Sequence, residues 1–169
     1  MLAYQDGNAG AFETLYTRHR GRLYRFLLRS VKARSTAEEL FQEVWIRVIE
    51  SRGRYAPQAR FTTWLYTIAH NLLTDHWRKK GLVLVELDED AQAPAPDDPA
   101  RSVEARQALS RFAAALEALP PLQRQAFLMH EEGGLSIAEI AQATGSNEEA
   151  AKSRLRYAMA KLKSAVDDG

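Results

Sequence analysis

The chain of 169 residues contains no cysteine. This absence excludes disulfide bonds, zinc fingers and thiol catalysis. No run of apolar residues is long enough to cross a bilayer, and the first seven residues lack the basic-then-apolar pattern of a signal peptide. We therefore expect a soluble, cytoplasmic protein with no membrane insertion.

The chain also lacks the residue patterns of an active site. It has no glycine-rich phosphate loop and no nucleophile motif. Its four histidines (His19, His70, His76 and His130) do not follow a metal-ligand spacing, since His70 and His76 are six residues apart and off a common helix face. We expect no catalytic residues, no metal site and no cofactor, so the chain is not expected to be an enzyme.

The net charge of +1 hides an uneven distribution of charge along the chain. Residues 1–85 carry 14 Lys and Arg against 7 acids, residues 86–105 carry 1 against 7, and residues 106–169 carry 8 against 8. Three prolines and five acids fall within residues 88–99, a composition typical of an extended, flexible linker. This pattern predicts an N-terminal domain (1–85), an acidic linker (86–105) and a C-terminal domain (106–169).

Both predicted domains have the apolar periodicity of helices and lack the alternation of strands, which predicts an all-α fold of two small helical domains. Ser35 and Thr36, followed by Glu38 and Glu39, form a capping-box pattern at the start of one helix. Before residue 135, we expect helices over residues 11–28, 35–50, 61–80 (one helix or a pair), 103–118 and 121–132.

Residues 60–80 combine aromatic side chains with a cluster of cations. Aromatic rings stack on unpaired bases, and cations neutralise phosphates, so the combination favours a surface that handles nucleic acid. The aromatic residues are also candidates for a hydrophobic core. The residues concerned are Phe61, Trp64, Tyr66 and Trp77 among Arg60, Arg78, Lys79 and Lys80.

Residues 136–164 have the form of a helix-turn-helix. Ser136 with Glu139, and Ser146 with Glu149, have capping-box spacing on either side of Gly145, a residue suited to a left-handed helix end. Inward-pointing positions of the second helix are Ala151, Leu155, Ala158 and Leu162. The outer face, which a recognition helix presents to a major groove, holds Glu149, Lys152, Ser153 and Arg156, with Arg154 on the flank.

Three blocks in order resemble bacterial RNA polymerase sigma factors of the extracytoplasmic-function (ECF) type, in the sigma-70 family. They are residues 37–45 (AEELFQEVW), residues 61–71 (FTTWLYTIAHN) and the helix-turn-helix ending at residues 152–155 (KSRL). The resemblance covers essentially the whole chain. It implies a factor that binds core polymerase, recognises −35 and −10 promoter elements and promotes DNA melting. Implied partners are the coiled coil of the largest subunit, the flap region, promoter DNA and an anti-sigma factor, with the chain itself a monomer.

The resemblance also assigns roles to individual residues. Residues 37–50 match the polymerase-docking helix, with Glu39, Gln42, Glu43, Ile46 and Ile49 at the surface. Independently, Ile46 and Ile49 lie far round the helix from Val44, so they are either an exposed patch or covered by another helix. The −10 element is assigned to Trp64, Asn71, Leu72, Thr74, Asp75, His76, Arg78, Lys79 and Lys80. Of these, Asn71 would pair with the edge of a flipped base. The −35 element is assigned to Glu149, Lys152, Ser153, Arg154 and Arg156.

Two features of the sequence qualify this picture. Ala150-Ala151 stands where the family usually has a Thr-Val pair, which removes a hydroxyl that could hold a phosphate. The acids Asp88, Glu89, Asp90, Asp97 and Asp98 could imitate RNA phosphates in the path that the family's linker threads through polymerase, or serve as a soluble spacer. A dimeric helix-turn-helix regulator, which would bind palindromic sites, and an adaptor for acidic proteins are the alternative readings.

Overall fold

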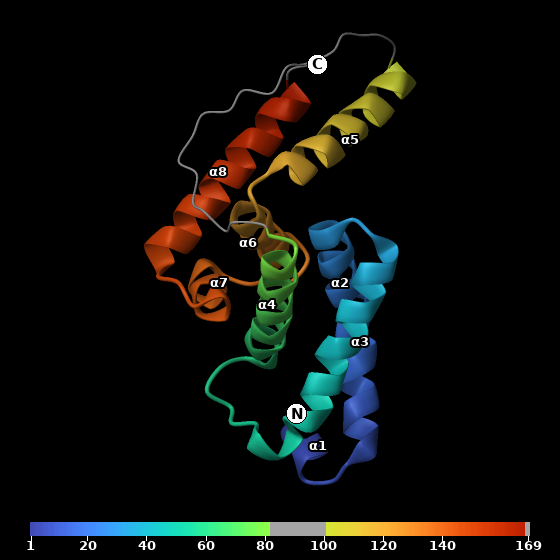
Figure 1. Cartoon of the computed structure of the whole chain (residues 1–169), viewed down its shortest axis with the longest axis vertical. Helices are drawn as coiled ribbons and strands as arrows, with labels where there is room; N and C mark the ends of the chain where they lie inside the picture. The colour runs from blue at the N-terminus through green and yellow to red at the C-terminus, as the bar shows by residue number, and fades with distance from the viewer. Residues whose placement is uncertain (82–100, 168–169) are drawn as a thin grey trace.

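The structure, a computed structural model, describes residues 1–81 and 101–167, and within them it holds only helices and connecting turns (Figure 1). The predicted all-α fold of two small helical domains is confirmed. In chain order the elements are α1 (Leu2–Gln5), α2 (Ala9–Val31), α3 (Arg34–Glu50), the 3-10 turn η1 (Arg52–Arg54), α4 (Phe61–Lys79), α5 (Arg101–Ala118), α6 (Pro121–Glu131), α7 (Ile137–Thr144) and α8 (Glu148–Asp167).

The N-terminal helices α2 and α3 pack side by side, and α4 packs beside them, mainly against α3 (Figure 1). Their shared core is fully buried, because each helix turns one apolar stripe inward. Asn8 caps the start of α2, its side chain accepting from the Ala11 amide at 3.2 Å. The buried core residues include Leu23, Phe26, Leu27, Val44, Val48, Leu65 and Leu73.

In the C-terminal part, α8 packs along α5 and α6, and α7 joins α6 to α8. Ala151, Leu155, Ala158 and Leu162 are all buried, as their spacing predicted. Ser136 and Glu139 form the predicted capping box of α7, and Gly145 ends that helix at φ 63°. Local signals therefore fix both ends of α7, the first helix of the helix-turn-helix.

Two predicted caps are wrong. The N-cap of α3 is Ala33 and makes no side-chain hydrogen bond, so Ser35 and Thr36 lie inside the helix. At α8, Asn147 rather than Ser146 accepts from a first-turn amide, that of Ala150 at 2.8 Å. The Ser146 hydroxyl instead lies 2.9 Å from that of Thr144, a competing local bond of the kind that serine often makes.

The predicted linker lies largely outside the described residues, as do the acids assigned to the RNA path. Its last residues, 101–105, are the start of helix α5 rather than an irregular segment. The boundary between the domains at residue 85 stays a prediction. For the described residues, the N-terminal domain is used below for 1–81 and the C-terminal domain for 101–167.

The two domains pack against each other. Helix α4 contacts α7, and α2 contacts α6, so that α4 stands between the two halves of the molecule (Figure 1). The buried apolar residues of both domains form one continuous cluster. This contact was not predicted from the sequence, which indicated two independent units.

Candidate nucleic-acid interface

The polar edge of α4 carries most of the residues assigned to the −10 element. Asn71, Asp75 and Arg78 are exposed and follow helical spacing, so they lie on one face. Lys79 and Lys80 are also exposed and end the helix, where cations interact favourably with the carboxyl end of the helix dipole. The structure therefore brings an amide, a carboxylate and three cations to one accessible strip.

Other residues assigned to the −10 element lie deeper. Trp64, Thr74 and His76 are half-buried, and Leu72 is buried in the core of the domain. The Thr74 hydroxyl is buried without a hydrogen-bond partner in the described part of the chain. Burial lowers the pKa of His76, and Lys80 and Lys79 lower it further, which favours the neutral imidazole.

The aromatic residues of α4 are mainly structural. Tyr66 is 1% exposed and Trp77 is 3% exposed, which removes both rings from the surface. Phe61 and Trp64 are half-buried and form a cluster with Tyr55, whose ring meets that of Trp64 edge-on at 5.0 Å. Tyr55, in the preceding loop, escaped the sequence reasoning because no period marks a loop residue.

The outer face of α8 is open. Glu149, Lys152 and Arg156 are exposed, while Ser153 and Arg154 are half-buried. The Arg156 guanidinium lies 5.2 Å from the centre of the Tyr157 ring, a cation–π contact with the ring of the next residue. The helix thus presents two cations and an acid on a face that could enter a major groove.

Helix α3 carries the predicted polymerase patch. Ile46 and Ile49 are 46% and 47% exposed, so within the described structure no other helix covers them. Glu39 and Gln42 are exposed beside them. Glu43 is half-buried and pairs with Arg47 at 3.1 Å. An apolar patch bordered by acids suits a partner with an apolar, basic surface.

One face of α4 is occupied by the C-terminal domain. The Thr63 hydroxyl donates to Glu139 at 2.8 Å, Arg60 lies 3.5 Å from the same carboxylate, and the His70 ring bonds to Gln125 at 2.8 Å. Burial opposes the charge on Glu139, but bonds from Thr63 and Ser136 outweigh it and lower its pKa. The two sequence segments that meet here are more than fifty residues apart.

The close approach of the domains depends on Gly133. A Cβ at this position would meet the Met129 carbonyl oxygen at 2.6 Å, the Leu135 side chain at 2.7 Å and the Tyr66 ring at 3.1 Å. A side chain here would clash first with the Met129 carbonyl and Leu135 in its own turn, and it would also crowd Tyr66 of α4 across the domain contact. Sequence reasoning did not single out this glycine.

Within residues 1–81 and 101–167, no cluster of His, Asp or Glu could hold a metal ion. No helix among the described residues is both long and apolar enough to cross a membrane.

Comparison with protein-family models identifies the family of the chain. A model described as Sigma-70 region 2 matches residues 15–82, and one described as Sigma-70, region 4 matches residues 109–162. The chain belongs to the sigma-70 family. In this sigma factor, α3 and α4 lie within region 2, and α7 and most of α8 lie within region 4.

Relatives place the sigma factor in the ECF group. It is 38% identical over 167 residues to the RNA polymerase sigma factor CarQ of Myxococcus xanthus, covering 96% of this chain and 93% of CarQ. It is 33% identical over 159 residues to the ECF RNA polymerase sigma factor BldN of Streptomyces coelicolor, covering 90% of this chain and 59% of BldN. RNA polymerase and promoter DNA follow as its partners from the two sigma regions.

Solved structures share the fold of this sigma factor. CnrH, solved in complex with the cytosolic domain of CnrY, aligns with a TM-score of 0.70 at 23% identity, covering 97% of this chain and 92% of CnrH. RpoE of Bartonella quintana, solved with the anti-sigma factor NepR, aligns with a TM-score of 0.71 at 22% identity, covering 93% of this chain and 97% of RpoE. Both likenesses extend over the two domains.

Proposed function

We propose that this ECF sigma factor docks on core polymerase through the exposed face of α3. Ile46 and Ile49 supply apolar area, and Glu39, Gln42 and Glu43 supply the polar border. The partner is the coiled coil of the largest subunit, with the C-terminal domain meeting the flap region. Because polymerase acts in the cytoplasm, the protein acts there as well.

The −10 element is read by the exposed strip of α4. Asn71 carries both a donor and an acceptor, so it can pair with the edge of a base taken out of the stack. Asp75, Thr74 and His76 shape the site, whereas Arg78, Lys79 and Lys80 bind phosphates and carry no sequence information. Trp64 borders this surface, and Leu72 supports it from the core.

The −35 element is read by α8 in a major groove. Lys152 and Arg156 are the exposed cations, Arg154 and Ser153 lie on the flank, and Glu149 near the start of the helix can accept from a cytosine amino group. The pair Ala150-Ala151 offers no hydroxyl to a phosphate, so the backbone is held by other residues.

The chain is a monomer and not an enzyme, and its anti-sigma partner binds both domains. The exposed strip of α4 lies outside the helix-turn-helix formed by α7 and α8. It supports two unlike DNA-reading surfaces on one chain, rather than one surface repeated in a dimer. This one observation separates a sigma factor from a dimeric regulator, which would need only α8.

The test is run-off transcription with purified core polymerase on fragmented genomic DNA, with and without the protein. New start sites that share spaced −35 and −10 elements support the proposal. Binding to polymerase without new starts would indicate a regulator that needs another factor, and no binding would contradict the docking role of α3.

A further inference from the structure

The contact between the domains is held by ion pairs of one polarity. Four pairs among the described residues cross it, and in each the cation belongs to the N-terminal domain and the acid to the C-terminal domain. The pairs are Arg25 and Arg29 with Glu132, Lys32 with Glu117 at 3.0 Å, and Arg60 with Glu139 at 3.5 Å.

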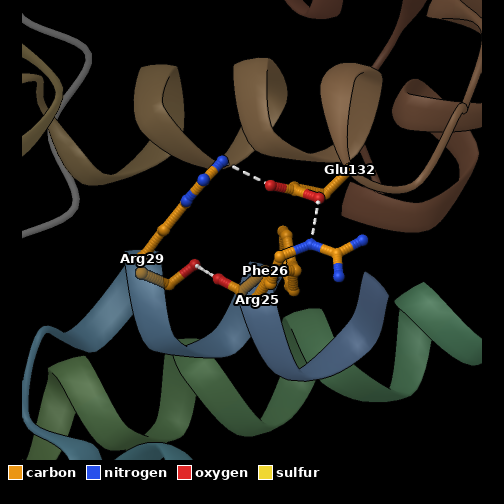
Figure 2. Close-up of polar contacts among 5 residues, drawn as sticks. Arg25, Phe26, Arg29 and Glu132 are labelled. Carbon is orange, nitrogen blue, oxygen red and sulfur yellow. Dashed lines mark hydrogen bonds and ion pairs between the residues drawn. The ribbon is translucent and has the colours of Figure 1, made fainter. Parts of the chain in front are cut away.

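Glu132 is the centre of this arrangement. It lies just after α6 and points between two arginines of α2, as Figure 2 shows. Arg25 Nε donates to Glu132 Oε2 at 3.0 Å, and Arg29 donates to the other carboxylate oxygen. The carboxylate side chain is only 11% exposed, whereas each arginine side chain is 50% exposed. One acid is thus enclosed by two cations that still reach solvent.

The two arginines belong to a longer row. Arg18, Arg22, Arg25 and Arg29 follow spacings of four, three and four residues, which places them on one face of α2. All four are exposed. Arginine binds phosphate with two parallel hydrogen bonds, so a row of guanidinium groups on one helix face is suited to a nucleic-acid backbone. Glu132 occupies the half of this row nearest the end of the helix.

The packed arrangement also brings the two DNA-reading helices together. Helix α4 contacts α7, which in turn contacts α8, and His70 on α4 bonds to Gln125 on α6, a helix that also packs against α8. Asn71 is the next residue after His70. Elements centred 35 and 10 base pairs upstream of a start site lie roughly 85 Å apart along straight duplex DNA at 3.4 Å per base pair. Helices this close cannot read both elements at once, so the domains must separate when the promoter is bound.

The packing is suited to such a separation. The pairs of Lys32 with Glu117 and of Arg60 with Glu139 are partly exposed and contribute little to stability, which leaves the enclosed Glu132 as the main ionic contact between the domains. The Tyr66 hydroxyl and the Gln125 side-chain nitrogen are buried without hydrogen-bond partners in the described part of the chain. Water would satisfy both groups in the separated form, so they favour opening against the apolar contacts that favour closure.

We propose that the arginine row of α2 is a further binding site for the DNA backbone, and that Glu132 covers it in an autoinhibited, packed form of the protein. The carboxylate takes the place of a phosphate between Arg25 and Arg29. DNA and the C-terminal domain therefore compete for the same cations, so that binding of DNA favours separation of the domains. The inference rests on the proposed function for the need to separate, but the existence of the site does not depend on it.

The test compares two neutralising substitutions one residue apart. Glu132→Gln removes the carboxylate between the arginines, and Glu131→Gln makes the same change of charge at an exposed neighbour that forms none of the four ion pairs. Because the chain has no cysteine, Ser35→Cys and Gln142→Cys, both exposed, provide two specific label sites for energy transfer between the domains. DNA affinity is measured on unlabelled protein with a 30-base-pair duplex lacking promoter sequence.

We expect Glu132→Gln to lower the transfer efficiency and to tighten duplex binding about threefold or more at low salt, because a closed fraction no longer reduces the apparent affinity. Glu131→Gln should leave the efficiency unchanged and alter affinity by less than about 1.5-fold. The variant Arg25→Glu/Arg29→Glu/Glu132→Arg, which reverses the polarity of the contact, should restore transfer and weaken duplex binding below that of the original chain. Thermal melting of each variant shows that it is folded.

Unchanged transfer in Glu132→Gln would overturn the proposal, as would opening with no more gain in affinity than Glu131→Gln gives. Neither readout involves polymerase or a promoter. If both behave as expected while run-off transcription fails, the masked site stands and the proposed function falls.

Discussion

The two DNA-reading helices are placed very differently in the molecule. Helix α4 is the centre of the N-terminal domain and also the support for the C-terminal domain, so only one strip of it faces solvent. Helix α8 buries four small or apolar residues and leaves Glu149, Lys152 and Arg156 exposed on its outer face. The first helix is therefore constrained on most of its circumference, and the second on one side only.

Because of this difference, the sequence predicts the accessible residues of α8 better than those of α4. The aromatic residues that make α4 stand out in the sequence are largely buried, and the accessible groups are an amide and a few charges. In α8 the accessible residues are the ones that the helical spacing predicts. The apolar period predicts the exposed face of a helix that is buried on one side, but not that of a helix buried on two sides.

The largest expected effect is on the free energy of unfolding, and it distinguishes the buried side of α4 from its exposed strip. Leu73 is fully buried on the inner side of α4, and Leu73→Ala should lower the free energy of unfolding by about 2–5 kcal/mol because it leaves a cavity. Asn71→Ala, two residues away on the exposed strip, should change it by less than about 0.5 kcal/mol. Urea denaturation of both variants measures the difference. Similar losses would show that the strip is part of the core rather than a surface.

The next effect concerns α8. Arg156→Ala should weaken binding to a −35 duplex by about 1–3 kcal/mol if Arg156 contacts a base. Lys163→Ala, an exposed cation farther along the same helix, is the matched control for lost charge. Fluorescence anisotropy with a set of −35 variants measures both. A loss that is uniform across the variants would identify Arg156 as a phosphate contact.

A smaller effect is expected for α4 in promoter opening. Asn71→Ala should reduce formation of the open complex about tenfold, or 1.4 kcal/mol, because the flipped base loses its polar partner. Affinity for the −35 element should stay nearly intact. Permanganate footprinting at the −10 element, beside −35 binding assays, separates the two. Equal loss in both assays would contradict the assignment of Asn71 to the −10 site.

The smallest effect is on pH dependence, and it concerns the face of α4 that the C-terminal domain covers. Burial holds the pKa of His70 below its ordinary value of 6.5 in the packed form; the hydrogen bond to Gln125 opposes this shift only in part, and Arg154 and Arg78 lower the pKa further. The separated form therefore takes up a proton first as the pH falls through about 6.5, and the packed form loses stability. Glu139 contributes in the same sense only below pH 4.5, because its pKa is lowered.

Energy transfer between the labelled domains should accordingly decrease from pH 7.5 to pH 5.5. The variant His70→Gln keeps a hydrogen-bonding side chain without titrating, so its curve should be flat over this range. A decrease of the same size in His70→Gln would assign the pH dependence to another group.

Much of the fold follows from local sequence signals. The helical periods, the Ser136–Glu139 box and Gly145 are each decided within a few residues, and the structure confirms them. The caps of α3 and α8 were harder, since serine, threonine and asparagine all make local hydrogen bonds and neighbours decide which one forms. The exposure of Ile46 and Ile49 was left open by the sequence, because a period gives the direction of a side chain but not what covers it.

The packing of the domains could not be predicted from the same signals. Glu132 and Glu139 look like ordinary helix-end acids, and Arg25 and Arg29 look like an exposed helix face. Glu132 pairs with Arg25 and Arg29, which lie 107 and 103 residues earlier in the chain, and Glu139 pairs with Arg60; no local pattern encodes these relations. In the sequence, Gly133 resembles any glycine of a turn. Only its short distance to Tyr66 shows that it permits close contact between the two domains.

The distance of 107 residues between Arg25 and Glu132 also has a consequence in time. A ribosome that adds about 5–20 residues per second needs roughly 5–20 s to travel from one to the other. During that interval the arginine row of every nascent chain emerges with no carboxylate to receive it, beside the ribosome's own RNA. Each molecule therefore passes once through an uncovered state before the acid that closes it has been made.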